Sequence, residues 1–118
     1  MFKFNKMSYI LVTLIIVLTM SQLSFADSYQ IKNVGSNLCL TVKNASKEKG
    51  ANIIQWTCHE QGNEMWKLKR INEYYQLINF GSNLCLTVKN ASKKNDANII
   101  QWTCNEQGNE VWKILLIP

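Results

Sequence analysis

Short runs of alternating apolar and polar residues, separated by small and polar clusters, cover most of the chain beyond residue 26. In the first half they are YQIKNVG at 29–35, LCLTV at 38–42, NIIQWTC at 52–58 and EMWKL at 64–68. A period of two with many β-branched and aromatic residues is typical of strands, and the intervening Gly, Asn and Ser clusters are typical of turns. No window in this part keeps an apolar helical period for three turns, so we expect an all-β fold with almost no helix.

The whole pattern occurs twice at an offset of 46 residues. Residues 29–67 and 75–113 are identical at 31 of 39 aligned positions, and NLCLTVKNASK is repeated letter for letter at 37–47 and 83–93. Self-similarity at a fixed period of this kind indicates an internal duplication. We therefore expect two units of four strands each, unit 1 at about residues 27–72 and unit 2 at about residues 73–118.

The first 26 residues have the pattern of a secretory signal peptide. Lys3 and Lys6 precede the apolar run YILVTLIIVLTM at 9–20, and small residues, Ser24 and Ala26, stand three and one positions before the expected cleavage point. The apolar run of 12 residues is shorter than the roughly 20 that a spanning helix needs. We expect residues 1–26 to be cleaved, leaving residues 27–118 as a secreted or periplasmic domain with no membrane span.

The charged residues give no sign of a nucleic-acid partner. The chain has 13 Lys and Arg against 8 Asp and Glu, and no basic run is longer than the group of Lys67, Lys69 and Arg70. A nucleic-acid interface needs a basic patch or stripe, so this scattered charge predicts an ordinary solvated surface.

All four cysteines lie beyond residue 26, in two pairs with a separation of 19 residues: Cys39 with Cys58, and Cys85 with Cys104. An even number of cysteines in a small exported chain argues for disulfides, and a bridge within each unit is the simplest pairing. The chain has no CxxC pair and one His, so we expect neither a metal site nor a cofactor.

Each unit combines GSNLCLTV, then NIIQWTC, then NEMW or NEVW. This combination resembles the ricin B-chain-type (QxW) lectin repeat of the β-trefoil fold, with its Gly-containing turn, Cys-Leu-Asp-Val, Trp-x-Cys strand and Asn-Gln-x-Trp. The resemblance covers residues 29–117. It implies a β-trefoil-like fold with two of the usual three units, and disulfides Cys39–Cys58 and Cys85–Cys104.

The resemblance also implies one carbohydrate site in each unit. The family's sugar-binding positions are occupied by Thr41, Trp56, Asn63 and Glu64 in unit 1 and by Thr87, Trp102, Asn109 and Glu110 in unit 2. The Trp that stacks on a sugar ring and the Asn are retained, whereas Thr replaces the Asp that binds hydroxyls and Glu replaces the Gln. The last Trp of each motif, Trp66 or Trp112, is expected in the core.

These residues predict a secreted carbohydrate-binding module without catalysis, which stacks glycans on Trp56 and Trp102. The missing Asp keeps an alternative open, a protein-binding accessory or cell-targeting subunit of a toxin that has lost sugar binding. A module cut from a larger hydrolase is a third interpretation. Glu64 and Glu110 do not predict a glycosidase, because equivalent positions of two units would lie on separate lobes and such enzymes need neighbouring carboxylates.

Two units leave a trefoil incomplete. A β-trefoil closes with three units, and each unit buries its apolar face only against its neighbours. We expect open strand edges and a partly uncovered core beside Trp66 and Trp112, and such edges recruit other chains. The sequence therefore predicts self-association, most simply as a symmetric homo-oligomer, or completion of the trefoil by a partner subunit.

Overall fold

The computed structural model describes residues 27–116, so the expected signal peptide at residues 1–26 lies outside the described residues. The described part is all-β, with helical structure limited to single 3-10 turns. No helix within it is long and apolar enough to cross a membrane.

The elements alternate between strands and single 3-10 turns along both units. In chain order they are β1 (Ser28–Tyr29), β2 (Cys39–Val42), η1 (Lys43–Ala45), β3 (Ile53–Trp56), η2 (Gly62–Glu64), β4 (Trp66–Ile71), β5 (Tyr74–Asn79), β6 (Cys85–Val88), η3 (Lys89–Ala91), β7 (Ile99–Trp102) and η4 (Gly108–Glu110). Unit 1 thus has the four expected strands. The fourth segment of unit 2 is reduced to a single bridge, in which Trp112 pairs with Tyr75.

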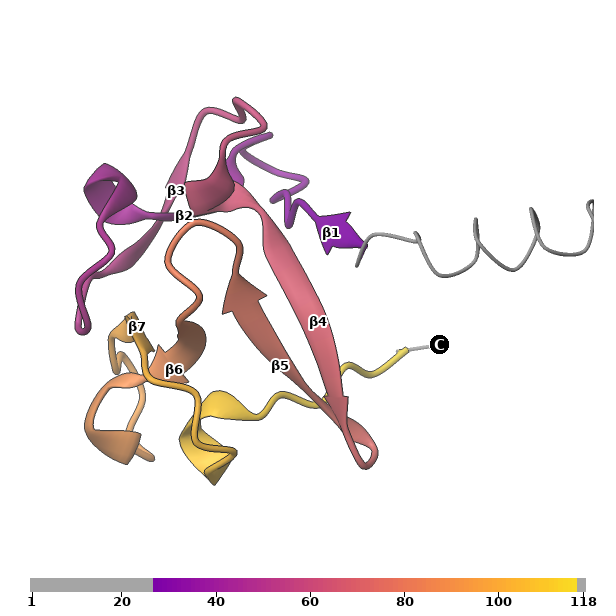
Figure 1. The fold of residues 1–118 in the computed structure, drawn as a ribbon, viewed down its shortest axis with the longest axis vertical. Helices are drawn as coiled ribbons and strands as arrows, with labels where there is room; N and C mark the ends of the chain where they lie inside the picture. Colours follow the sequence, from indigo (N-terminus) through magenta and orange to yellow (C-terminus); the bar gives the residue numbers. More distant parts are fainter. Residues whose placement is uncertain (1–26, 117–118) are drawn as a thin grey trace, which may run out of the picture.

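The β4–β5 hairpin joins the two units (Figure 1). Its register runs from Trp66 opposite Asn79 to Ile71 opposite Tyr74. The turn passes through Asn72 at a φ of 55°, a left-handed conformation that Asn tolerates better than most residues. β5 then continues the sheet in the order β1-β4-β5-β6-β7, while β2 and β3 form a separate pair. This arrangement explains the weak fourth strand of unit 2, because the described chain provides no next strand for it.

Each unit carries one short hairpin closed by a disulfide. In β2–β3 Cys39 lies opposite Trp56, and in β6–β7 Cys85 lies opposite Trp102. The bridges join Cys39 to Cys58 and Cys85 to Cys104, so the expected pairing is confirmed. Closing a loop of this length stabilises a domain by roughly 3 kcal/mol in the chain-entropy account. Two such disulfides indicate an oxidising compartment.

The hydrophobic core is shared between the units. Its buried residues are Val42 and Trp66 from unit 1 and Leu77 and Leu86 from unit 2. Trp66 is 0% exposed, and its indole Nε1 donates a hydrogen bond of 2.9 Å to the carbonyl oxygen of Leu40. The expected core position of Trp66 is confirmed, whereas Trp112 is only half-buried.

A buried glutamine of unit 2 holds a loop of unit 1. The Oε1 of Gln101 accepts a hydrogen bond of 2.7 Å from Ser82 Oγ, which orients the amide. Its Nε2 then donates to the carbonyl oxygens of Ser46 at 2.9 Å and Glu48 at 2.8 Å. Gln101 is 0% exposed, so this contact satisfies backbone groups that have lost their water. We call this set of hydrogen bonds the glutamine clamp.

Two glycines allow the units to approach closely at a second place. A Cβ on Gly62 would lie 3.1 Å from the Cα of Gly81, and a Cβ on Gly81 would lie 3.1 Å from the carbonyl carbon of Gly62. The N–H of Gly81 donates to the oxygen of Gly62 at 3.1 Å. Backbone therefore packs on backbone here, and no side chain fits between.

A buried glutamate fixes the loop that follows each disulfide. Glu64 is 1% exposed, and its Oε1 accepts hydrogen bonds from the backbone N–H groups of His59 and Glu60 and from Gln30 Nε2. The carboxylate therefore acts as a local template for the loop, since it replaces the water that these N–H groups would otherwise bind.

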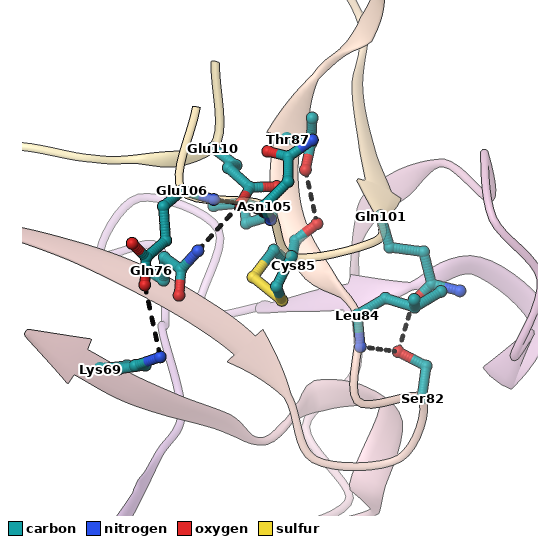
Figure 2. The surroundings of a disulfide bond; sticks show 12 residues. Lys69, Gln76, Ser82, Leu84, Cys85, Thr87, Gln101, Asn105, Glu106 and Glu110 are labelled. Atoms are coloured by element: carbon teal, nitrogen blue, oxygen red, sulfur yellow. Dashed lines mark hydrogen bonds and ion pairs between the residues drawn. A yellow bond between two sulfur atoms is a disulfide. The ribbon is translucent and has the colours of Figure 1, made fainter. Parts of the chain in front are cut away.

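Unit 2 repeats this arrangement. Glu110 is 0% exposed and accepts from the backbone N–H groups of Asn105 and Glu106 and, at 2.9 Å, from Gln76 Nε2 (Figure 2). Its second oxygen, Oε2, is buried without a hydrogen-bond partner among the described residues. Both glutamates thus have the same structural task in equivalent loops.

We expect Trp66→Ala to lower the free energy of unfolding by about 3–5 kcal/mol, the usual cost of truncating a large buried aromatic residue. Trp56→Ala is the matched control, because Trp56 is 57% exposed and should change stability little. Chemical denaturation of the oxidised protein measures both variants. Equal destabilisation by the two substitutions would show that Trp56 also supports the core.

We expect Glu64→Ala and Glu110→Ala each to lower stability by about 1.5–3 kcal/mol, because each removes a charged acceptor and leaves loop N–H groups unpaired. Glu48→Ala removes an exposed carboxylate as the control and should stay within about 0.5 kcal/mol. Hydrogen exchange should show that the loss of protection is concentrated at residues 59–60 or 105–106. Unchanged protection there would contradict the template role.

Candidate functional site

One hollow of unit 1 lies at the residues that the sequence singled out. It has a volume of about 340 Å³. Its walls come from the end of β2, from η1, from β3 and from the loop held by Glu64, and they comprise Thr41, Val42, Lys43, Asn44, Ala45, Ile54, Trp56, His59, Gln61, Asn63 and Glu64. All four predicted residues of unit 1 therefore border one hollow.

Trp56 is the exposed aromatic surface of this hollow. It ends β3, opposite Cys39, so the disulfide and the hairpin together fix its backbone. Its side chain is 57% exposed, and the equivalent Trp102 is 43% exposed. Most large aromatic residues are buried on average, and an exposed indole in a concave place is suited to contact with a flat apolar surface.

Asn63 borders the same hollow as Trp56, and its side-chain amide already makes a hydrogen bond to the backbone. Its Nδ2 donates to the carbonyl oxygen of Val42 at 3.4 Å, and in unit 2 Asn109 Nδ2 donates to Val88 at 3.2 Å. These bonds tie η2 to β2 and η4 to β6. The orientation of each amide is therefore fixed before any ligand arrives.

The threonines are buried rather than presented to solvent. Thr41 is 3% and Thr87 is 2% exposed. Thr41 donates a hydrogen bond of 2.8 Å to the carbonyl oxygen of Cys39. Thr87 donates one of the same length to the carbonyl oxygen of Cys85 (Figure 2). A buried hydroxyl bonded to its own strand thus occupies the position at which the resemblance places a carboxylate.

Glu64 borders the hollow, but the loop described above uses its Oε1, and Glu110 is held likewise in unit 2. Each carboxylate is bonded to the loop of its own unit, and none of the hydrogen bonds described links Glu64 to Glu110. Among residues 27–116 there is also no group of three or more His, Cys, Asp or Glu that could hold a metal ion.

Sequence reasoning missed four polar residues of the hollow, namely Lys43, Asn44, His59 and Gln61. Lys43, Asn44 and Gln61 have identical counterparts in unit 2, so the repeat did not distinguish them from other conserved positions of the two units. His59 stands out more, because it is one of the eight positions at which the units differ and unit 2 has Asn105 there. The difference between His59 and Asn105 was the feature of the sequence that could have identified His59 as part of the hollow.

The two units do not offer equal sites. In unit 1 the side of Trp56 is open to the hollow, whereas the loop of unit 1 approaches Trp102 in unit 2. A Cβ on Gly50 would lie 3.8 Å from Cζ3 of Trp102. The neighbouring unit therefore forms one wall beside Trp102, and the described chain provides no such wall beside Trp56.

Comparison with known proteins agrees with this geometry. The family described as ricin-type beta-trefoil lectin domain-like matches residues 19–102 and 63–117. A designed threefold-symmetric protein, ThreeFoil, is 34% identical with a TM-score of 0.71, over 73% of this chain and 62% of its own length.

Two natural proteins are similar over shorter shares of their length. An exo-beta-1,3-galactanase from Clostridium thermocellum is 30% identical with a TM-score of 0.75, over 80% of this chain and 21% of the galactanase. A Polyporus squamosus lectin, solved with a sialylated glycan epitope, shares the fold at 16% identity and a TM-score of 0.67, over 77% of this chain and 32% of the lectin. This chain thus spans less than two thirds of each of these proteins. The family match covers more than half of the sequence, and the chain belongs to the ricin-type beta-trefoil lectin domain-like family.

Proposed function

We propose that this protein is an exported carbohydrate-binding module without catalytic activity, and that it holds a glycan on Trp56 in the hollow of unit 1. The observation that carries the proposal is the exposed indole of Trp56, 57% exposed, in a hollow that Asn63 also borders. The family membership supports the same class of ligand.

The chemistry of binding follows from the wall of the hollow. One face of a pyranose ring carries axial C–H groups and is apolar, so it packs against the indole while its hydroxyls point to the rim. Amide and cationic side chains at the rim, Asn63, Gln61 and Lys43, can exchange hydrogen bonds with those hydroxyls. Oriented polar groups around an apolar surface are the usual arrangement of a small-molecule site.

The site should be weak on its own. Thr41 and Thr87 stand where the resemblance places a carboxylate, and their hydroxyls already donate to backbone oxygens, so this position supplies no charge-assisted acceptor in either unit. A second site around Trp102 and Asn109 compensates for weak affinity through avidity on a multivalent glycan surface.

The same buried threonines favour a second candidate, a protein-binding accessory or cell-targeting subunit that no longer binds sugar. In that case Trp56 would be an anchor for a protein partner, because exposed Trp residues are also common hot spots of protein interfaces. A direct measurement of glycan binding distinguishes the two candidate functions.

We expect Trp56→Ala to weaken glycan binding at least about tenfold, or about 1.4 kcal/mol, with the fold unchanged. Trp102→Ala should have a smaller effect, because the unit 1 loop already occupies space beside Trp102. The double variant should abolish binding. Intrinsic Trp fluorescence during titration, after a screen on a glycan array, measures all three.

Val34→Ala is a matched surface control, since Val34 is 98% exposed and lies outside the hollow. Absence of any array signal from the oxidised wild-type protein would count against glycan binding and in favour of the accessory role. Binding that survives the double Trp variant would place the glycan elsewhere.

A further inference from the structure

The ionisable side chains that border the hollow of unit 1 differ in what they offer to a ligand. Lys43 and His59 are exposed, whereas Glu64 is 1% exposed. The Oε1 of Glu64 already accepts hydrogen bonds from two loop N–H groups and from Gln30. The exposed charge that the described residues place at this hollow is therefore cationic.

Lys43 is fixed at the start of η1 by its own backbone. Its N–H donates to the carbonyl oxygen of Asn52 at 2.9 Å, and its carbonyl oxygen accepts from the N–H of Ser46 at 3.2 Å. The one ion pair among residues 27–116 joins Lys69 to Glu106. No described carboxylate thus pairs with the ammonium group of Lys43, and its three N–H donors can serve a ligand.

His59 distinguishes the two units at this place. Its backbone lies between a disulfide-bonded cysteine and Glu64, which accepts its N–H. Unit 2 has Asn105 at the equivalent position, and the Oδ1 of Asn105 accepts a hydrogen bond of 3.1 Å from the N–H of Gln107. The asparagine therefore serves its own loop, whereas no residue within 27–116 forms a hydrogen bond with the imidazole of His59.

Cationic groups at the rim of a hollow discriminate between ligands by charge. Hydrogen bonds with an ionised partner are roughly twice as strong as neutral ones. An ammonium group that exchanges water for a neutral hydroxyl therefore gains less than one that meets an anion. An imidazole can donate an N–H to the same anion in its neutral or its protonated form. A sugar becomes an anion when it carries a carboxylate or a sulfate group, so the exposed groups of the hollow favour such a sugar.

We propose that the hollow of unit 1 selects acidic glycans, whose carboxylate or sulfate group binds to Lys43 and His59 while the sugar ring packs on Trp56. This inference rests on the carbohydrate-binding function proposed above and adds the class of ligand. The hollow of about 340 Å³ lies in the usual range of small-molecule sites. Lys43 and His59 determine specificity because they contact the substituent, whereas Trp56 holds the ring whatever its charge.

Unit 2 selects less strongly by charge. Lys89 is exposed like its counterpart Lys43, but Asn105 replaces the imidazole and is bonded to its own loop. Unit 2 thus retains one of the two groups that would bind the anion. The preference of the whole protein for acidic glycans comes mainly from unit 1.

A glycan array with matched acidic and neutral forms of the same oligosaccharides tests the class of ligand. The acidic glycan with the strongest signal is then titrated into the oxidised protein by calorimetry, beside its carboxyl-reduced or desulfated form. We expect the acidic form to bind at least about tenfold more tightly. Added salt should reduce the difference, because it screens exposed charges. Uronic acid and sulfated members of the array distinguish the two anionic groups, and equal affinities for the acidic and neutral forms would overturn the proposal.

Three exposed positions provide the variants. We expect Lys43→Gln to lower the ratio of acidic to neutral affinity at least about fivefold, because glutamine keeps a donor but loses the charge. His59→Asn installs the residue of unit 2 and should lower this ratio by about threefold. Lys94→Gln removes the same charge as Lys43→Gln from an exposed position outside the hollow and should leave the ratio unchanged. An equal loss with Lys94→Gln would indicate general attraction to a basic surface and overturn the proposal.

The outcomes separate the acidic ligand from the carbohydrate-binding function on which it rests. Neutral glycans that bind as tightly as acidic ones, and that lose affinity in Trp56→Ala, would overturn the acidic ligand and leave the glycan site in place. Acidic glycans that bind Trp56→Ala as tightly as the wild-type protein would place the anion outside the hollow and overturn the proposal. Silence of the whole array would overturn the carbohydrate-binding function and the acidic ligand together.

Discussion

Neither unit of this protein can bury its apolar residues by itself, and this constraint determines the rest of the structure. The core consists of Val42 and Trp66 from one unit and Leu77 and Leu86 from the other, so it forms only when the units meet. The β4–β5 hairpin keeps the units adjacent, and the contact of Gly62 with Gly81 brings their backbones together. Burial of this kind is the dominant favourable term in folding.

The hollow beside Trp56 depends less on that shared core than on local restraints. The Cys39–Cys58 bridge and the β2–β3 hairpin fix Trp56, while Glu64 fixes the loop at residues 59 and 60. Each restraint lies within one unit and spans few residues. Rigid walls reduce the entropy that a weakly bound ligand loses on binding, so they favour affinity even where few strong hydrogen bonds form.

Features that depend on short-range interactions along the chain could be predicted from the sequence. The strands, the disulfide pairs and the buried Trp66 followed from alternation, from Cys spacing and from a family resemblance. Gln55 and Gln101 show the limit, because both stand in the sequence NIIQWTC and yet one is exposed and the other buried. The two glutamines differ because their units have different neighbours in the fold. The repeated sequence is the same in both units, so it does not indicate which neighbour a unit has. The loop role of Glu64 and the burial of Thr41 likewise depend on backbone groups that a sequence pattern does not display.

The two exposed tryptophans differ in their surroundings, although their units are nearly identical in sequence. In unit 2 the loop of the preceding unit lies beside Trp102, which is 43% exposed, whereas Trp56 has no such neighbour among the described residues and is 57% exposed. A loop beside an indole covers part of the apolar surface on which a flat ring could stack, so Trp56 offers the larger surface. The position of each unit in the fold therefore distinguishes two sites that the repeated sequence makes equivalent.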